Sequence, residues 1–264
     1  MGAIDIRHLS YSYGTGNNTA PALDNIDLSI KDGEFICVIG HSGCGKSTLL
    51  RILAGLAMPT AGEAYIDNKP IQGPGTDRTV VFQHYSLFPW LTAIGNVQFG
   101  IRQSKKSISK KQAGELARIY LEKVSMDTSM DKYPYQLSGG MQQRVAIART
   151  LAMDSDILLL DEPFGAIDVK IRRGLQLLME SLWRDSRRAK TVVFVTHDID
   201  EAIFLADRII FMRPANVYAD ISVPFGRPRD YGELIKSALY ERLKDELLEL
   251  FYLDSELTED EEAL

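Results

Sequence analysis

Short, continuously apolar runs alternate along this chain with segments that have the pattern of helices. These runs span residues 34–39, 79–82, 156–160 and 191–196. Runs of this kind are typical of strands buried on both faces, as in a parallel sheet covered by helices. The helical patterns lie between them, at residues 46–54, 168–184 and 198–206. The alternation predicts an α/β fold with a mostly parallel sheet.

The beginning of the chain has a different pattern. Apolar residues alternate with polar ones over 3–13 and 22–30, around the polar turn GTGNNTAP. This predicts an antiparallel β flap laid on the main sheet.

Strand signals are absent from about residue 92 to residue 150. Helical patterns cover 112–124 and 140–152, and the basic segment 103–111 is expected to be an exposed loop. We interpret this region as a helical subdomain carried by the α/β core. The predicted organisation is therefore a first core part with the flap and a glycine-rich loop, the helical subdomain, a second core part, and a closing helix with a tail: residues 1–91, 92–152, 153–230 and 231–264.

The end of the chain combines an apolar stripe with an acidic tail. Ile235, Leu239, Leu243, Leu247 and Phe251 recur every four residues and predict one helix over 231–253. Packing against the body is the favoured role of this stripe, with dimerisation or docking as the alternative. The last eleven residues hold six carboxylates and no base, and we expect them to be solvated and disordered.

Composition and charge exclude several classes of protein. Without the acidic tail the bases and acids balance, so the body offers no basic surface for nucleic acid. No apolar run approaches the ~18 residues that a membrane-spanning helix requires. The two cysteines form neither a disulfide framework nor a CxxC pair, and no signal core follows Met1. We expect a cytosolic chain that does not itself cross a membrane.

The most specific motif lies between an expected strand and an expected helix. It matches the pattern G-x-x-x-x-G-K-[ST]. Glycines allow the backbone to turn its N–H groups toward phosphate oxygens. Lys46 would bind the β and γ phosphates of ATP, and Ser47 would offer its hydroxyl to Mg²⁺. A nucleophile elbow, G-x-S-x-G, is excluded because its last position is Cys44. The residues of the motif are Gly40, His41, Ser42, Gly43, Cys44, Gly45, Lys46 and Ser47.

A second motif ends the apolar run that begins at Ile157. Asp161 and Glu162 follow this run at the carboxyl end of an expected strand, which is where α/β sheets bind ligands. Asp161 would hold Mg²⁺, directly or through water. Glu162 would orient, or take a proton from, the water that attacks the γ phosphate.

Residues 137–144, LSGGMQQR, closely resemble the LSGGQ signature of the ABC-type ATPase family. In physical terms, a serine and two glycines open a helix whose free N–H groups and dipole can face an anion. Further elements of the family follow its order along the chain. Tyr13 stands where the family stacks an aromatic ring on adenine, Gln83 resembles the Q-loop glutamine, Asp168 belongs to a D-loop-like segment and His197 resembles the switch histidine.

The resemblance spans about residues 3–213 and implies a complete set of site residues. The catalytic set is Glu162, His197, Gln83 and Lys46. The metal set is Ser47, Gln83 and Asp161. Beyond the glycine-rich motif, the set that contacts ATP is Tyr13, Thr48, Ser138, Gly139, Gly140, Met141, Gln142 and Asp168. In this family the signature acts on the ATP of a partner, which implies a dimer with an identical or similar subunit.

Finer features resemble one branch of the family. The segments PGTDR at 74–78 and LFPWLTA at 87–93 look like those of the nitrate, sulfonate, taurine and bicarbonate importer group. They also resemble those of relatives that handle pyrimidine precursors of thiamine. The resemblance to the importer group implies an ATP-hydrolysing subunit that energises import of a small oxyanion. The implied partners are transmembrane permease subunits and, indirectly, a periplasmic or lipoprotein solute-binding protein, with no nucleic acid. The implied location is the cytoplasmic face of the plasma membrane, as a peripheral subunit.

The sequence leaves alternatives open for the function of the chain and for the role of Trp90. A soluble ABC ATPase in cofactor assembly, or in another role outside transport, is the main one, although it lacks the two segments quoted above. An inactive binding module is disfavoured by the intact Lys46, Asp161, Glu162 and His197. Trp90 either docks a permease coupling helix, together with Phe88 and Pro89, or fills the core of the helical subdomain.

Two residues of the glycine-rich motif, His41 and Cys44, lead to separate predictions. His41 stands where the importer group often has Pro or another small residue, which could alter the stiffness of the loop. Cys44 lies beside the start of the expected helix, and we expect its alkylation to block ATP binding and bound ATP to protect it.

Overall fold

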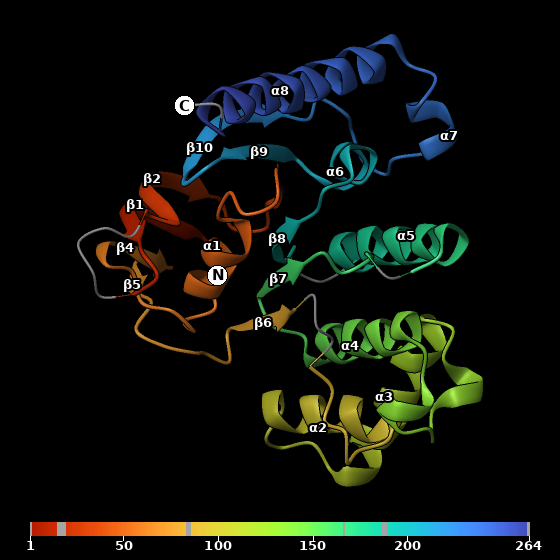
Figure 1. Ribbon diagram of the computed structural model, residues 1–264. Helices are drawn as coiled ribbons and strands as arrows, with labels where there is room; N and C mark the ends of the chain where they lie inside the picture. Colours follow the sequence, from red (N-terminus) through yellow and green to blue (C-terminus); the bar gives the residue numbers. More distant parts are fainter. Residues whose placement is uncertain (1, 15–19, 83–85, 166, 186–188, 263–264) are drawn as a thin grey trace. The chain divides into compact units, whose positions relative to one another are not determined.

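The computed structural model describes residues 2–14, 20–82, 86–165, 167–185 and 189–262, and they form two compact units (Figure 1). The first unit comprises Met1–Pro74 and Thr191–Leu264, and the second comprises Gly75–Lys190. The finer division into four parts stays a prediction. Within the described part of the chain, no helix combines the length and the apolar character needed to cross a membrane.

The first unit contains a four-stranded ladder in the order β10-β9-β3-β8. Its strands are β3 (Phe35–Gly40), β8 (Thr191–Val195), β9 (Arg208–Arg213) and β10 (Asn216–Ser222). Strand β3 pairs in parallel with both β8 and β9, whereas β9 and β10 are antiparallel. Every residue of β3 and β8 is buried, which confirms the predicted strands and their burial on both faces. The β9–β10 hairpin was not predicted, although four apolar residues, 209–212, marked β9.

The beginning of the chain forms a separate antiparallel sheet in the same unit, with the order β2-β1-β4-β5. Its strands are β1 (Ile4–Tyr11), β2 (Leu23–Ile30), β4 (Ala61–Ile66) and β5 (Lys69–Pro70). The antiparallel pairing of β1 with β2 confirms the expected flap strands. Strands β4 and β5 were missed because only Ala64 and Ile66 of β4 are buried, which leaves almost no apolar alternation to recognise.

The helices of the first unit are α1 (Lys46–Leu53), α6 (Ile199–Leu205), α7 (Tyr231–Leu234) and α8 (Ala238–Glu262). The expectation of one helix over 231–253 is wrong, because the helical conformation is interrupted between α7 and α8. The Ser237 hydroxyl accepts a hydrogen bond from Tyr240 N at 3.1 Å and donates one to Leu234 O at 2.9 Å, so it ends one helix and starts the next.

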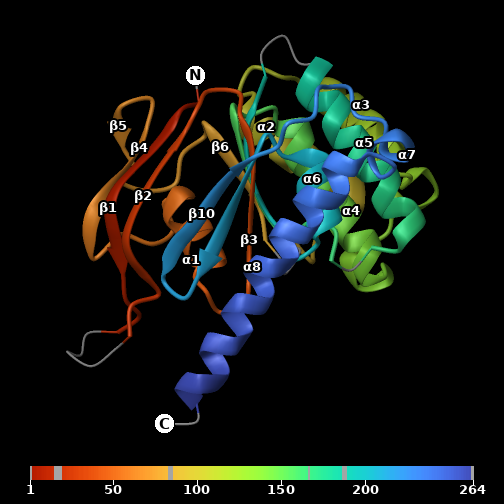
Figure 2. The same cartoon turned by 90° about the horizontal axis from the view of Figure 1, so that it is seen from above.

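The structure of helix α8 differs from two expectations about the end of the chain. It continues to Glu262, through a segment expected to be disordered, and this segment is rich in the good helix former glutamate. Of the predicted apolar stripe, Leu243 and Leu247 are buried, but Ile235 and Leu239 are each 40% exposed. Figure 2 shows the helix running from α7 to the end of the chain.

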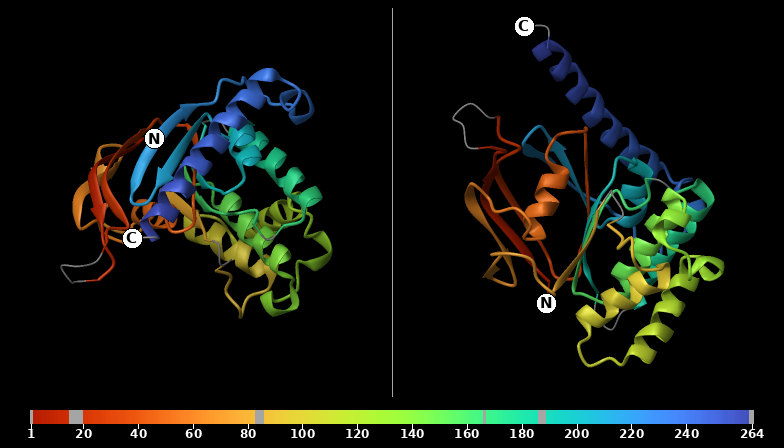
Figure 3. Two further views of the ribbon diagram at one scale, coloured as in Figure 1. Left: turned by 45° about the horizontal axis from the view of Figure 1, so that its top comes forward. Right: turned by 60° about the horizontal axis from the view of Figure 1, so that its bottom comes forward.

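The described residues of the second unit form a pair of parallel strands, four α-helices and two short 3-10 helices, Asp127–Ser129 and Pro134–Gln136. The strands are β6 (Arg78–Val81) and β7 (Ile157–Asp161). The helices are α2 (Ala93–Ser104), α3 (Lys110–Lys123), α4 (Gly139–Met153) and α5 (Val169–Asp185). Helices α2, α3 and α4 pack against one another (Figure 3).

Most of these elements confirm the predicted helices and strands of the region, and α2 is the exception. The sequence feature that could have indicated the start of α2 is Thr92. Its hydroxyl accepts a hydrogen bond from Gly95 N at 3.2 Å as an N-cap. The loop expected over 103–111 is shorter than predicted, because α2 reaches Ser104 and α3 begins at Lys110. Ser109 and Gln112 form a capping box there, in which each side chain accepts from the other residue's backbone N–H.

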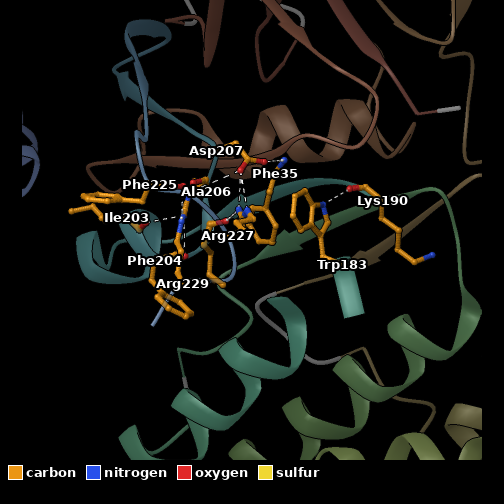
Figure 4. Close-up of polar contacts among 11 residues, drawn as sticks. Phe35, Trp183, Lys190, Ile203, Phe204, Ala206, Asp207, Phe225, Arg227 and Arg229 are labelled. Atoms are coloured by element: carbon orange, nitrogen blue, oxygen red, sulfur yellow. Dashed lines mark hydrogen bonds and ion pairs between the residues drawn. The ribbon is translucent and has the colours of Figure 1, made fainter. Parts of the chain in front are cut away.

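Two arginines complete the carboxyl end of α6 (Figure 4). The buried Arg229 guanidinium donates to the carbonyl oxygens of Ile203 and Phe204, each at 3.0 Å, and to that of Ala206 at 2.7 Å. Arg227 donates to the carbonyl oxygen of Leu205 and to Asp207. The last carbonyls of a helix have no partner within the helix, so these side chains satisfy groups that would otherwise be buried without one.

This cap predicts that Arg229→Met destabilises the first unit, because it leaves several buried carbonyls without a donor. We expect a loss of about 2–4 kcal/mol in the free energy of unfolding, measured by urea denaturation. Arg242→Met is the matched control on an exposed position of α8, and it should change stability by less than about 0.5 kcal/mol. Equal stability of the two variants would contradict the capping role.

Candidate functional site

The glycine-rich motif forms the loop that joins β3 to α1. Gly40, Gly43 and Gly45 have φ angles of 145°, 83° and 111°, which residues with a side chain rarely adopt. A Cβ atom on Gly40 would lie 2.2 Å from the carbonyl oxygen of Met212. A Cβ atom on Gly45 would lie 2.5 Å from that of Ala22. The path of the loop therefore requires glycine at these two positions.

Lys46 is held inside this loop by backbone oxygens. Its Nζ donates to the carbonyl oxygens of Gly40 at 2.8 Å and His41 at 2.6 Å. The side chain is buried, and its ammonium group lies 3.6 Å from the Cys44 sulfur. The thiol of Cys44 is itself buried, so a reagent can reach it only when the loop opens. The effect of alkylating Cys44 stays a prediction.

The structure brings two further predicted residues to the helix that follows the loop. Ser47 is exposed at the start of α1, whereas Thr48 is buried. The hydroxyl groups of Tyr13 and Thr48 are hydrogen-bonded at 2.8 Å. The Tyr13 ring is 51% exposed and meets Tyr11 edge-on, with 5.0 Å between ring centroids. An exposed aromatic face thus lies beside the glycine-rich loop.

His197 follows strand β8, directly after Thr196. Because β8 and β3 are parallel neighbours, the segment after β8 and the glycine-rich loop lie at the same edge of the sheet. His197 is exposed, whereas Thr196 and Glu201 beside it are buried. The Thr196 hydroxyl donates to Glu201 Oε2 at 2.7 Å and accepts from the Asp198 N–H at 3.0 Å. Glu201 was not among the predicted site residues. The sequence feature that could have indicated it is its position four residues after His197.

The second unit holds the predicted acidic pair at the end of β7. Asp161 is buried as the last residue of this strand, and Glu162 follows with a φ angle of 46°. A positive φ is uncommon for a residue other than glycine, and such backbone strain is often found at functional sites. The Gln143 side chain of α4 donates to the Glu162 carbonyl oxygen at 3.0 Å. This contact, which the sequence did not reveal, links the acidic pair to the signature helix.

The signature residues form the start of α4. The Ser138 hydroxyl accepts from Met141 N at 3.3 Å as the N-cap, and the Gln142 side chain donates to the Leu137 carbonyl oxygen at 3.1 Å. Ser138 is exposed, and Gly139 and Gly140 are half-buried, so the amino end of the helix is open to a ligand. Helix amino ends favour anions through their free N–H groups and their dipole.

The remaining predicted site residues have different outcomes. Asp168 precedes α5, and its carboxylate accepts from Ile171 N at 3.1 Å. Gln83 lies outside the described residues.

Among the residues described here, no cluster of three or more His, Cys, Asp or Glu side chains is arranged to hold a metal. The oxygen donors of Ser47 and Asp161 are nevertheless of the kind that Mg²⁺ prefers, since this ion commonly combines one or two carboxylates with substrate phosphates.

The exposure of Trp90 excludes one of the two interpretations of its role. Its side chain is 70% exposed and therefore does not fill the core of the second unit. Phe88 contacts the rings of Trp90 and Phe99, with centroid distances of 5.5 and 4.7 Å, and Phe99 is 41% exposed. Exposed apolar patches often mark interaction surfaces, and docking of a partner at this cluster stays a prediction.

Comparison with known proteins places these features in one family. The family model described as ABC transporter matches residues 23–165. The chain is 45% identical over 254 residues to the bicarbonate transport ATP-binding protein CmpD of Synechocystis sp., covering 94% of this chain and 89% of that protein. It is 45% identical over 234 residues to the nitrate import ATP-binding protein NrtD of Synechococcus elongatus, covering 88% and 85%. The nitrate transport protein NasD of Klebsiella oxytoca is 43% identical over 253 residues, with coverages of 94% and 96%.

Solved structures agree with this assignment. The dimeric structure of MJ0796, a bacterial ABC transporter cassette, superposes with a TM-score of 0.78 at 37% identity, covering 84% of this chain and 100% of that one. The same cassette in a post-hydrolysis state bound to ADP and Pi gives a TM-score of 0.77 at 36% identity, with the same coverages. The P-loop α/β fold expected from the sequence is thereby confirmed. The chain belongs to the ABC transporter family, as one of its ATP-binding, ATP-hydrolysing subunits.

Proposed function

We propose that this chain energises the import of a small oxyanion, such as nitrate, bicarbonate, a sulfonate or taurine. The observation that carries the proposal is the glycine-bounded loop that buries the ammonium group of Lys46 between β3 and α1. Similarity to bicarbonate and nitrate transport subunits over most of the chain supports the choice of solute class. The chain would act at the cytoplasmic face of the membrane, as a peripheral subunit.

The loop explains how the chain would bind the phosphates of ATP. Lys46 is held by neutral carbonyl oxygens, which are weaker partners for an ammonium group than charged phosphate oxygens. Lys46 would therefore exchange them for the β and γ phosphates, while backbone N–H groups of residues 40–48 bind the remaining oxygens. Bound Mg²⁺ would neutralise charge on the phosphates. Ser47, Asp161 and Gln83 would hold the ion.

Hydrolysis would depend on residues at the ends of two strands. Glu162 would orient the attacking water and accept its proton, with its backbone held by Gln143. His197 would contact the γ phosphate, supported by Thr196 and Glu201. The signature residues, Ser138–Gln142, would contact the ATP bound to a second ATP-binding subunit. This requires dimerisation with an identical or similar chain, and Asp168 would lie near the dimer interface.

The aromatic cluster of Phe88, Trp90 and Phe99 would dock a transmembrane permease subunit. Exposed aromatic side chains lose water-accessible area on docking and often dominate the energy of an interface. A solute-binding protein outside the membrane would deliver the oxyanion to that permease. ATP binding would close the dimer, and hydrolysis would reopen it.

The position of Tyr13 predicts that its ring stacks on adenine. Tyr13→Ala should raise the Kd for ATP roughly tenfold, since stacking of a base on an aromatic ring contributes about 1–3 kcal/mol. Tyr13→Phe is the matched control, because it keeps the ring and removes only the hydrogen bond to Thr48. Equilibrium titration with a fluorescent ATP analogue measures both, and equal affinities for the two variants would rule out stacking.

The role given to Glu162 predicts a trapped state. Glu162→Gln should keep ATP binding, reduce ATP hydrolysis by about 100-fold or more, and accumulate an ATP-bound dimer, because the proton acceptor is lost while the γ phosphate remains. Hydrolysis assays and size-exclusion chromatography with Mg²⁺ and ATP measure these effects. Glu115→Gln, on an exposed position of α3, should behave like the wild type. Normal turnover by Glu162→Gln would remove this residue from the proposed role.

The aromatic cluster gives a test of the transport role. Trp90→Ala should leave the Kd for ATP unchanged and reduce recovery of the permease with the chain by at least about tenfold, as expected for an aromatic side chain that dominates an interface. Affinity purification from membranes in mild detergent measures recovery. Leu56→Ala, which shortens an apolar side chain that is 55% exposed on the first unit, is the control. Undiminished recovery with Trp90→Ala would exclude this surface as the docking site.

A further inference from the structure

Helix α8 reaches the glycine-rich loop from the other end of the chain. Nε2 of His41 donates to the carbonyl oxygen of Phe251 at 3.1 Å, across 210 positions of sequence. The two rings also meet edge to face, with 5.2 Å between centroids and 71° between planes. His41 is thus held both by a hydrogen bond and by an aromatic contact from α8.

Phe251 packs at the same time against the strand next to the loop. Its ring meets that of Phe211 on β9 at 5.0 Å and 85°. Phe211 pairs with Ile39 of β3, and the next pair in register joins Met212 to Gly40, the first residue of the loop. Phe251 therefore touches the loop and the strand that supports it.

The rest of α8 is anchored beside His197. Lys244 forms an ion pair of 2.8 Å with Asp200, and the Tyr240 hydroxyl is hydrogen-bonded to the same carboxylate. Asp200 belongs to α6 and stands three residues after His197. At a rise of about 1.5 Å per residue, the helix from Tyr240 to Phe251 spans about 16 Å. One rigid element thus connects the helix after His197 with the loop that binds phosphate.

The contacts that hold the ring of His41 also affect the position of Lys46. The carbonyl oxygen of His41 accepts from Lys46 Nζ at 2.6 Å and from Cys44 N at 3.4 Å. Fixing the ring of His41 restricts the peptide that carries this oxygen, and with it the position of the ammonium group. We propose that Phe251 is a positioning residue for the phosphate loop and that α8, through Phe251 and His41, sets the affinity of the chain for ATP. The inference rests on the role proposed above for the loop.

Titration of the purified full-length chain with N-methylanthraniloyl-ATP tests the proposal. Phe251→Ala should raise the Kd about 3- to 10-fold, the effect of losing one to two aromatic contacts. Phe251→Tyr should restore most of the affinity because it keeps the ring, and Phe251→Leu, which keeps apolar volume, should give an intermediate value. Leu239→Ala, on an exposed position of the same helix, should bind as the wild type does.

A double-mutant cycle with His41→Ala separates positioning from general loss of structure. Phe251→Ala should have little further effect on the Kd when His41 is already alanine, because both changes break the contact between the two rings. An unchanged Kd for Phe251→Ala, an equal increase in both backgrounds, or an equal effect of Leu239→Ala would overturn the proposal. If the wild-type chain itself failed to bind the analogue, the proposed function would fall instead.

Discussion

The structure depends on one electrostatic arrangement, the burial of an ammonium group among neutral oxygens. Lys46 sits inside the turn between β3 and α1, where carbonyl oxygens of Gly40 and His41 satisfy it. A buried charge without an opposite charge is costly, so the loop has to hold these oxygens in place. The fully buried strand β3 and its parallel neighbours supply that rigidity, and the glycines allow the path of the loop. The same arrangement leaves the ammonium group ready for a stronger, anionic partner.

In the proposed function, the two units supply different parts of the ATP chemistry. The first provides the phosphate loop, the aromatic ring of Tyr13 and the histidine after β8. The second provides the carboxylates after β7, the signature at the start of α4 and the exposed aromatic cluster. Contacts within each unit prepare its residues: Thr196 and Glu201 brace the segment that carries His197, and Gln143 holds the backbone of Glu162. The end of the chain adds α8, which links the segment after His197 to the loop.

Local patterns made much of this predictable. The phosphate loop, the acidic pair and the signature each follow from a few adjacent residues at the end of a strand or the start of a helix. Most helices have an apolar pattern of helical period, and the buried strands are continuous apolar runs. Long-range contacts left no such trace. Nothing near Arg229 indicates that it caps α6, and nothing near Phe251 indicates that it meets His41. Strands β4 and β10, which expose many of their residues, and the break at Ser237 were missed for lack of a strong apolar pattern.

In the proposed function, ATP chemistry at this loop serves a membrane transporter. The most direct measurement is affinity purification of the native chain from membranes in mild detergent, followed by mass spectrometry of the proteins recovered. We expect a polytopic permease to be recovered in fixed stoichiometry with the chain. Recovery of the chain only from the soluble fraction, without a membrane partner, would contradict the transport role while leaving the ATP site intact.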